Sequence, residues 1–249
     1  MATPKMSDTA GLTGQDPAAA WQRWWGGIDG TPGEIVWDAD SRDLEADLGH
    51  FAGSFGRALP VVDFGCGDGR QTRFLARHFP TVLGVDLSPA AIAQARAADN
   101  PPNAGYRVLD ARDTTGAARL HHELGDANVY IRGVLQALPA AHRPQAAQSI
   151  AALLGATGTL FVKELPPEAA AYFAAVTRRH GLPPGLAKVM AHIPPGQISL
   201  PELVRLFPAG RFEVVSTGTS RMHTVNTLPD GEVIMVPAIW ALIRPRRGQ

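Results

Sequence analysis

Three glycines at every second position stand out in this chain, in the segment Asp63-Phe-Gly65-Cys-Gly67-Asp-Gly69. Two valines precede Asp63, and such a β-branched run is typical of a buried strand. Glycine is needed where a Cβ atom would collide with a ligand or forbid the backbone angles of a tight loop. The segment therefore predicts a strand that ends in a loop whose backbone approaches a bound molecule.

A second apolar run, Thr81 to Val85, ends in Asp86, and Leu87 and Ser88-Pro89 follow as the expected start of a helix. An acid at the tip of the second strand, roughly 20 residues after the glycines, binds ribose hydroxyls in nucleotide-binding α/β domains. An ionised carboxylate can accept hydrogen bonds from both hydroxyls of the diol. The alternative is that Asp86 only caps the helix.

The glycine pattern differs from that of a dinucleotide-binding protein. A G-x-G-x-x-G string would end in a glycine where this chain has Arg70, and the chain has no evident hydride-relay residues, so a nicotinamide oxidoreductase is disfavoured. No phosphate-binding lysine follows the glycines, which excludes a P-loop.

The segment resembles motif I of the class I S-adenosylmethionine (SAM) dependent methyltransferases, and the resemblance spans residues 60 to 165. It implies SAM as the cofactor and S-adenosylhomocysteine as the product. The glycine loop would hold the methionine part, Asp86 the ribose diol, and Asp110 with the backbone of Ala111 the adenine; a turn-initiating role is the alternative for Asp110. The implied cofactor contacts on the first two strands and loops are Asp63, Gly65, Cys66, Gly67, Gly69, Asp86 and Leu87.

Cys66 is the only cysteine. We interpret it as a small packing residue between the glycines and not as a nucleophile, because the family pattern has no histidine partner for it.

The fourth predicted strand carries Tyr130 and Arg132, where many class I methyltransferases have Asp or Asn. An arginine can bind a carboxylate through two parallel bonds, so Arg132 is predicted to anchor the carboxylate of SAM or the acceptor. The alternative is a structural ion pair, for which Asp63 is a candidate partner. A general base is needed only if the acceptor carries its proton; the candidates are Tyr130, His192 and His223.

Several shorter segments resemble the thiopurine S-methyltransferases, as a distant relationship. They are Trp21-Gln22-x-x-Trp25, Arg132-Gly133, the run from Ile198 to Phe207, and the pair Arg221 and His223. In that group the tryptophan segment closes over SAM and the basic pair lies near the substrate. The resemblance therefore implies that Trp21 and Trp25 cover the cofactor.

The charges balance, with 23 Lys plus Arg against 23 Asp plus Glu. A neutral chain lacks the basic surface of nucleic-acid-binding proteins, so a small-molecule acceptor and no nucleic acid are expected. A lone cysteine fits a reducing cytosol, and no apolar run is long enough for a membrane span, which predicts a cytoplasmic protein without a membrane segment. No residues have metal-ligand spacing, and we expect a monomer or homodimer. Abundant Ala, Pro and Gly hint at a GC-rich bacterial genome.

From about residue 59, strand and helix patterns alternate, which predicts a parallel sheet with helices on both faces. Pro229-Asp230-Gly231 separates the last two strands and predicts a hairpin, so the last strand should be antiparallel to its neighbour. With the methyltransferase resemblance, the expected fold is an α/β three-layer sandwich with a seven-stranded, mostly parallel sheet, an antiparallel last strand and a helical N-terminal cap. Strands are expected near 60–64, 81–86, 105–109, 128–131, 157–163, 211–217 and 232–243, and helices near 17–25, 40–55, 69–79, 89–98, 114–124, 142–154 and 167–179.

The chain divides into three expected parts. Residues 1–15 are polar and aperiodic and predict a disordered tail. Residues 16–56 form the helical cap, and residues 57–249 form the SAM-binding methyltransferase domain. Within that domain, the Pro- and Gly-rich section 181–199 is too long for an ordinary connector and predicts a substrate lid, with a surface insertion as the alternative.

These patterns predict a SAM-dependent methyltransferase that acts on a small molecule, with O- or N-methylation of a bacterial metabolite as the main interpretation. In-line displacement at the sulfonium methyl requires mainly alignment in a dry pocket. One alternative is a thiopurine-type S-methyltransferase. Another is a catalytically inert SAM-binding regulatory protein, because the motifs concern binding only.

Overall fold

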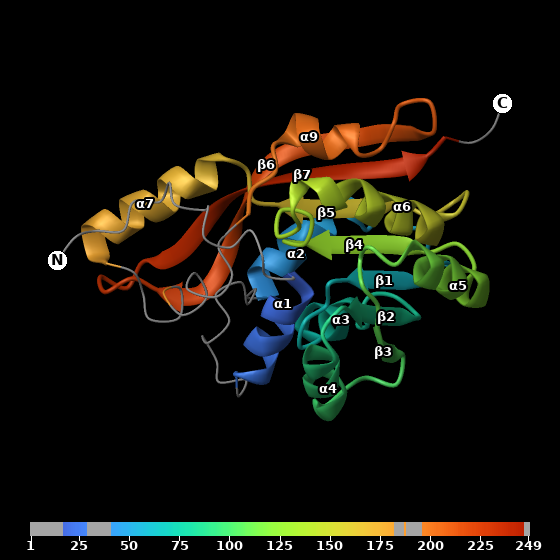
Figure 1. Ribbon diagram of the computed structural model, residues 1–249, viewed down its shortest axis with the longest axis horizontal. Helices are drawn as coiled ribbons and strands as arrows, with labels where there is room; N and C mark the ends of the chain where they lie inside the picture. The colour runs from blue at the N-terminus through green and yellow to red at the C-terminus, as the bar shows by residue number, and fades with distance from the viewer. Residues whose placement is uncertain (1–16, 29–40, 182–186, 188–195, 247–249) are drawn as a thin grey trace.

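The structure of the protein is a computed structural model, which describes residues 17–28, 41–181, 187 and 196–246 and contains one central β-sheet. Its seven strands lie in the order β3-β2-β1-β4-β5-β7-β6 (Figure 1). The strands β1 to β5 are parallel, and β7 runs antiparallel to both β5 and β6. The bounds are β1 Val61–Phe64, β2 Val82–Asp86, β3 Ala104–Val108, β4 Asn128–Arg132, β5 Leu160–Glu164, β6 Phe212–Thr227 and β7 Val233–Pro245.

Helices cover both faces of this sheet, which makes three layers. Successive side chains of a strand point to opposite faces. Val61, Tyr130 and Phe161 accordingly pack with α2 and α3, whereas their neighbours Val62 and Val129 pack with α5, α6 and α9. The helices are α1 Pro17–Gly26, α2 Ser41–Phe51, α3 Arg70–Leu75, α4 Pro89–Ala97, α5 Thr114–Leu124, α6 Arg143–Leu154, α7 Glu168–His180 and α9 Leu200–Arg205, with a 3₁₀ turn η2 at Ala140–His142.

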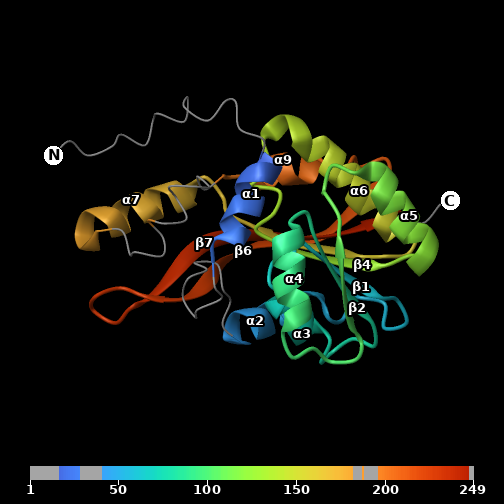
Figure 2. The ribbon, with the colours of Figure 1, turned by 60° about the horizontal axis from the view of Figure 1, so that its bottom comes forward.

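A third apolar cluster lies where β6 and β7 extend beyond the other strands. There α7 packs along the hairpin and α1 lies beside α4 (Figures 1 and 2). Trp24 and Trp25 from α1, Phe173 from α7, and Ile234 and Val236 from β7 are all buried in this cluster. The N-terminal helix is thereby attached to the carboxyl-end side of the sheet.

The predicted fold class is confirmed, including the reversed strand and the hairpin, whose turn is closed by a bond from Leu228 N to Glu232 O of 2.8 Å. Three elements differ clearly in length. Helix α2 ends at Phe51, short of the predicted residue 55, where Ser54 N donates to the Phe51 carbonyl at 2.8 Å in a tighter turn. Helix α3 ends at Leu75, short of the predicted residue 79, because i→i−3 bonds at Arg77 and His78 tighten the chain ahead of Pro80. Strand β6 continues to Thr227, ten residues beyond its predicted end.

Helix α9 was not among the expected elements. Ser199 and Glu202 form a capping box at its start, with Ser199 N to Glu202 Oε2 at 3.0 Å and Glu202 N to Ser199 Oγ at 3.4 Å. The predicted tail 1–15 and residues 182–186 and 188–195 of the predicted lid lie outside the described residues.

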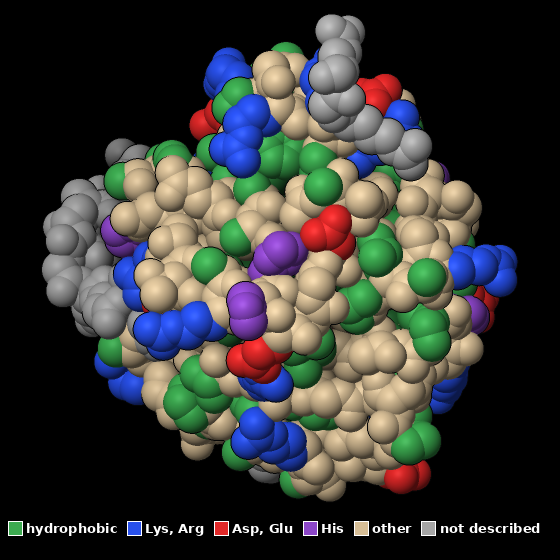
Figure 3. All heavy atoms as spheres, turned by 90° about the vertical axis from the view of Figure 1, so that its right-hand side faces the viewer, with side chains coloured by type: hydrophobic (Ala, Val, Ile, Leu, Met, Phe, Trp, Pro, Cys, Tyr) green, Lys and Arg blue, Asp and Glu red, His purple; other side chains and the backbone are tan. Residues whose placement is uncertain are grey.

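Among the described helices, none combines the length and apolar character needed to cross a bilayer. On the face shown in Figure 3, basic and acidic side chains are scattered without a continuous patch of one sign. That distribution agrees with the balanced charge of the chain.

Candidate functional site

The carboxyl ends of β1 and β4 meet where the order of the sheet reverses, since β2 and β3 lie on one side of β1 and β4 and β5 on the other. Ligands of open α/β sheets bind at this switch point. The loop that leaves β1 here contains Gly65, Gly67 and Gly69, with φ angles of 84°, 54° and 80°. Residues with a Cβ adopt this left-handed region at a cost, so the loop shape itself requires glycine.

Neighbouring side chains also exclude a Cβ at these glycines. A Cβ on Gly65 would overlap Val134 of the loop after β4, and one on Gly67 would lie 2.7 Å from the Trp25 ring. A Cβ on Gly69 would lie 2.6 Å from the ring of Tyr106. The glycine loop is therefore packed between the loop after β4, the N-terminal helix and β3.

Asp86 ends β2 beside this loop. Its Oδ2 accepts from Gly67 N at 3.0 Å and its Oδ1 from Ser88 N at 2.9 Å. Burial raises the pKa of Asp86, while the backbone N–H bonds, among them that of Leu87, oppose the rise. A carboxylate oxygen has a second acceptor position, so both oxygens can still accept from a diol. The helix cap is Ser88, whose Oγ accepts from Ala91 N at 3.2 Å, so the capping alternative for Asp86 is wrong.

Asp63 lies beneath the glycine loop and is 3% exposed. Its Oδ2 accepts from Thr72 Oγ1 at 2.5 Å, which ties β1 to α3. Burial raises the pKa of Asp63 to about 7, against the lowering effect of the Thr72 hydrogen bond. A direct contact of Asp63 with the cofactor stays a prediction.

Cys66 packs against Ile92, Ala95 and Tyr106 and is 2% exposed. Burial raises the pKa of its thiol well above the ordinary value. A buried, protonated thiol is a poor nucleophile, so the packing interpretation of Cys66 agrees with its environment.

Helix α1 is fixed over the glycine loop. The Trp25 ring faces Gly67, and Gln94 of α4 donates to the carbonyls of Trp25 at 2.9 Å and Ile28 at 3.3 Å. Ser88 Oγ donates to Gln22 at 2.7 Å. Trp21 is half-buried at the edge of the same cluster. The structure thus brings the tryptophan segment to the loop, and its contact with the cofactor stays a prediction.

Asp110 follows β3 at the same edge of the sheet, and Arg112 binds it through its side chain, with Arg112 Nη2 to Asp110 Oδ2 at 2.6 Å. This contact lowers the pKa of Asp110 and keeps the carboxylate ionised. Ala111 is buried against the helical layer of α5. The adenine role of both residues stays a prediction.

The site therefore combines a glycine loop, an acid at the tip of the second strand and a further acid beyond β3, and residues of these types at these positions fit SAM. Residues 61–158 match the family model described as a methyltransferase domain. The crystal structure of a SAM-dependent methyltransferase from Anabaena variabilis is 35% identical, has a TM-score of 0.87 and covers 93% of this chain and 96% of its own. The chain belongs to the class I SAM-dependent methyltransferases. Its cofactor is SAM.

Shorter matches connect this methyltransferase with named relatives. Trans-aconitate 2-methyltransferase from Deinococcus radiodurans is 41% identical over 81 residues, 32% of this chain and 28% of that protein. The chain thus spans less than a third of that relative's length. An N-methyltransferase from Bradyrhizobium japonicum in complex with S-adenosyl-l-homocysteine, 12% identical with a TM-score of 0.59 over 93% of this chain and 99% of that one, shares the fold.

A buried polar network occupies the sheet face under α2, next to the site. Lys163 Nζ of β5 lies 2.9 Å from Asp43 Oδ1 and 2.7 Å from Asp47 Oδ1. Arg132 Nη2 lies 2.7 Å from Asp43 Oδ2, and Tyr130 donates to Asp47 Oδ2 at 3.0 Å. The four charged side chains are at most 4% exposed. Two cations and two anions balance, so the network attaches α2 to the sheet without a net buried charge.

Two sequence-predicted site residues belong to this network. Arg132 was expected to bind a ligand carboxylate, with Asp63 as its alternative partner. Its ion pair is with Asp43, and Asp63 accepts instead from Thr72. Tyr130 was a candidate base, but it is 1% exposed, and burial raises the pKa of its phenol well above the ordinary value. The geometry thus favours a structural role for both, as a correction to the sequence-based interpretation.

The histidine candidates are separated. His223 lies half-buried on β6, and its carbonyl accepts from Arg132 Nη2 at 3.4 Å. His192 lies outside the described residues. His223 therefore remains the candidate base that can be placed on a described element. Within the described part of the chain, no group of His, Cys, Asp and Glu side chains could hold a metal ion.

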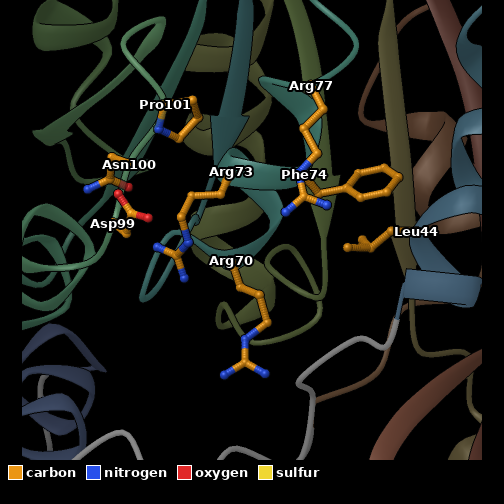
Figure 4. Close-up of a pocket in the computed structure, with 8 residues that line it drawn as sticks. All are labelled: Leu44, Arg70, Arg73, Phe74, Arg77, Asp99, Asn100 and Pro101. Carbon is orange, nitrogen blue, oxygen red and sulfur yellow. The ribbon is translucent and has the colours of Figure 1, made fainter.

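A hollow of about 540 Å³ lies along the flank of α3. Figure 4 shows Arg70, Arg73 and Arg77 from α3 and the turn after it, with Asp99 and Asn100 on the other side. Its lining comes from α2, from α3 and the turn after it, and from the connection before β3; Arg70 in this lining directly follows Gly69 of the glycine loop. Arg73 already donates to the Asp68 carbonyl at 2.9 Å.

Sequence reasoning missed Asp43, Asp47, Lys163 and Glu164, which position the site from outside the motifs. Asp43 and Asp47 have i, i+4 spacing and so share one helix face. Lys163 and Glu164 end an otherwise apolar strand, and charges at such a position were the available signal.

Proposed function

We propose that this methyltransferase transfers its methyl group to a small-molecule acceptor on an oxygen that is already ionised, a carboxylate being the clearest case. When bound, SAM supplies an electrophilic sulfonium methyl group. The chain must then orient the acceptor oxygen in line and exclude water. A carboxylate carries no proton near neutral pH, so no general base is needed.

The observation that carries this proposal is the burial of Tyr130. Its hydroxyl donates to Asp47 at 3.0 Å, and its raised pKa keeps it protonated. A phenol in this state neither reaches an acceptor nor removes a proton from one. N-methylation of an amine or O-methylation of a phenol would depend instead on His223 or on His192.

Arg221 and His223 are two residues apart on β6, so they lie on the same face of that strand. Their neighbour Met222 is buried on the opposite face. The guanidinium of Arg221 would suit an anionic substrate if the acceptor binds at this face. The name of the Deinococcus relative, trans-aconitate 2-methyltransferase, also supports a carboxylate as the acceptor.

A transfer assay with methyl-labelled SAM tests the proposal. The acceptors are di- and tricarboxylates including trans-aconitate, together with phenols, amines and aromatic thiols. We expect label in a carboxylate product that mild alkali releases as methanol, as an ester requires. Alkali-stable transfer to amines, phenols or thiols alone would contradict the carboxylate assignment, and aromatic thiols would then support the thiopurine-type alternative. SAM binding by calorimetry without transfer to any acceptor would favour the inert regulatory alternative.

A further inference from the structure

Glu164, the last residue of β5, is fully buried at 0% exposure. Its carboxylate accepts from three consecutive backbone amides of the loop after β4. Oε1 accepts from Val134 N at 3.1 Å and Leu135 N at 2.9 Å, and Oε2 accepts from Gln136 N at 3.0 Å. Three converging amides stabilise one particular loop conformation, because each bond restrains a successive peptide plane.

The same loop is held from its other side. Arg143 Nε donates to the Leu135 carbonyl at 3.1 Å, and its Nη2 donates to the Gln197 carbonyl at 2.8 Å. The Gln136 side chain accepts from Leu165 N. The amides of the loop thus face Glu164 while a carbonyl faces Arg143, so the segment 133–136 has little freedom to change shape.

This loop contacts the cofactor loop directly. Val134 occupies the space where Gly65 would carry a Cβ. Gly65 begins the glycine loop and has a φ of 84°. A shift of Val134 would therefore press on, or release, the backbone that approaches SAM.

The loop also contacts residues 196–197, ahead of α9. A Cβ on Gly196 would overlap the Gln136 carbonyl, and Arg143 binds the next residue, Gln197. The loop after β4 thus lies between the glycine loop and residues 196–197, which precede α9.

We infer that Glu164 is a positioning residue for SAM: its carboxylate sets the loop 133–136, and this loop sets the conformation of Gly65. The side chain acts through the loop and does not touch the reacting atoms. Burial raises the pKa of Glu164 to about 7, and the three amide bonds oppose this rise. The ionised form is the one that can accept all three amides.

The test is the isosteric variant Glu164→Gln, studied with the full chain. Its amide nitrogen would face a backbone N–H, so at least one of the three bonds is lost. We expect faster hydrogen exchange at Val134, Leu135 and Gln136, together with a rise of at least tenfold in the Kd of SAM by calorimetry. The control is Phe161→Leu on the same strand, which leaves a cavity in the apolar cluster on the opposite face of the sheet and lowers Tm; that cluster contains no residue of the loop 133–136.

A general loss of stability predicts equal effects in the two variants, whereas the positioning role predicts a raised Kd in Glu164→Gln alone. A folded Glu164→Gln protein with the wild-type Kd for SAM would overturn the inference. If that variant does not fold, Val134→Ala tests the next step, since it removes the contact with Gly65 and leaves the Glu164 bonds in place. The expected result is weaker SAM binding with a Tm close to wild type, and an unchanged Kd would again overturn the inference.

Discussion

Replacing Lys163 by Met tests the buried network most directly. The ammonium lies 2.9 Å from Asp43 and 2.7 Å from Asp47, and all three side chains are at most 2% exposed. Removing one member of a buried charge group leaves an uncompensated anion, which typically costs about 3–5 kcal/mol. For a chain of this size each kcal/mol lowers Tm by about 2–4 °C, so Tm should fall by about 6–20 °C.

The matched control is Arg244→Met. Arg244 and Glu213 also form an ion pair of 2.9 Å, but their side chains are 53% and 41% exposed. An exposed pair contributes at most about 1 kcal/mol. Urea unfolding of both variants therefore separates the effect of burial from the effect of distance. Equal losses in the two variants would refute the reasoning.

The pH dependence gives a second check on Lys163→Met. Burial already raises the pKa of Asp47, and the Lys163 charge is the main opposing cause. Without that charge the pKa of Asp47 rises further, so the carboxyl group takes up a proton as the pH falls. The stability deficit of the variant should accordingly shrink in acid. A deficit that is constant with pH would show that Asp47 is not the group left uncompensated.

Three further predictions concern the cofactor loop. Asp86→Asn should raise the Kd of SAM by about ten- to a hundredfold, or about 1.4–2.7 kcal/mol, in calorimetry; an unchanged Kd in the folded variant would remove the ribose assignment. Gly67→Ala should displace the Trp25 ring, seen as a change in tryptophan fluorescence, and weaken SAM binding, because the new Cβ lies 2.7 Å from the ring. Its control is Gly49→Ala, at an exposed position of α2 where a Cβ would have nothing within 4 Å, and it should leave both unchanged. Equal effects would contradict the packing argument. Folding raises the pKa of Asp63 from 3.8 to about 7, so the unfolded chain loses this proton at lower pH than the folded protein does. The free energy of unfolding should therefore fall, by up to about 4 kcal/mol, as the pH rises from about 4 to 7. The variant Asp63→Asn should lack this decline, and an unchanged slope in the variant would show that another group causes it.

The fold, and the glycine loop and strand end that carry the predicted cofactor residues, could be predicted because their signals are local. The glycines, Asp86 and Ser88 lie within one β-loop-α-β-α segment, where backbone geometry determines residue type over short distances. The hairpin was equally visible in Pro229-Asp230-Gly231, since turn chemistry depends on neighbouring residues. Helix α9 had a local signal too, the capping box of Ser199 and Glu202, which the prolines beside it obscured.

Arg132 and Tyr130 could not be assigned from their own surroundings in the sequence, because their partners come from a distant helix. Asp43 is separated from Arg132 by 89 positions, and Asp47 from Tyr130 by 83. Two acids at i, i+4 spacing on a helix resemble a solvated face, so nothing in α2 alone indicates that both are buried. An arginine at the end of a strand can either bind a ligand or form a structural ion pair, and the position of Arg132 in the sequence does not distinguish these two roles.

The side on which each strand-end charge lies separates these two roles. Tyr130, Arg132 and Lys163 occupy the face of the sheet covered by α2, where each meets an acid of that helix. Glu164, the next residue along β5, points to the opposite face and meets the backbone of the loop after β4. Because side chains alternate along one strand, the two neighbouring charges have different roles: Lys163 attaches α2 to the sheet, and Glu164 binds the loop that packs on Gly65. A substitution of Lys163 should mainly lower the stability of the fold, whereas a substitution of Glu164 should mainly weaken the binding of SAM.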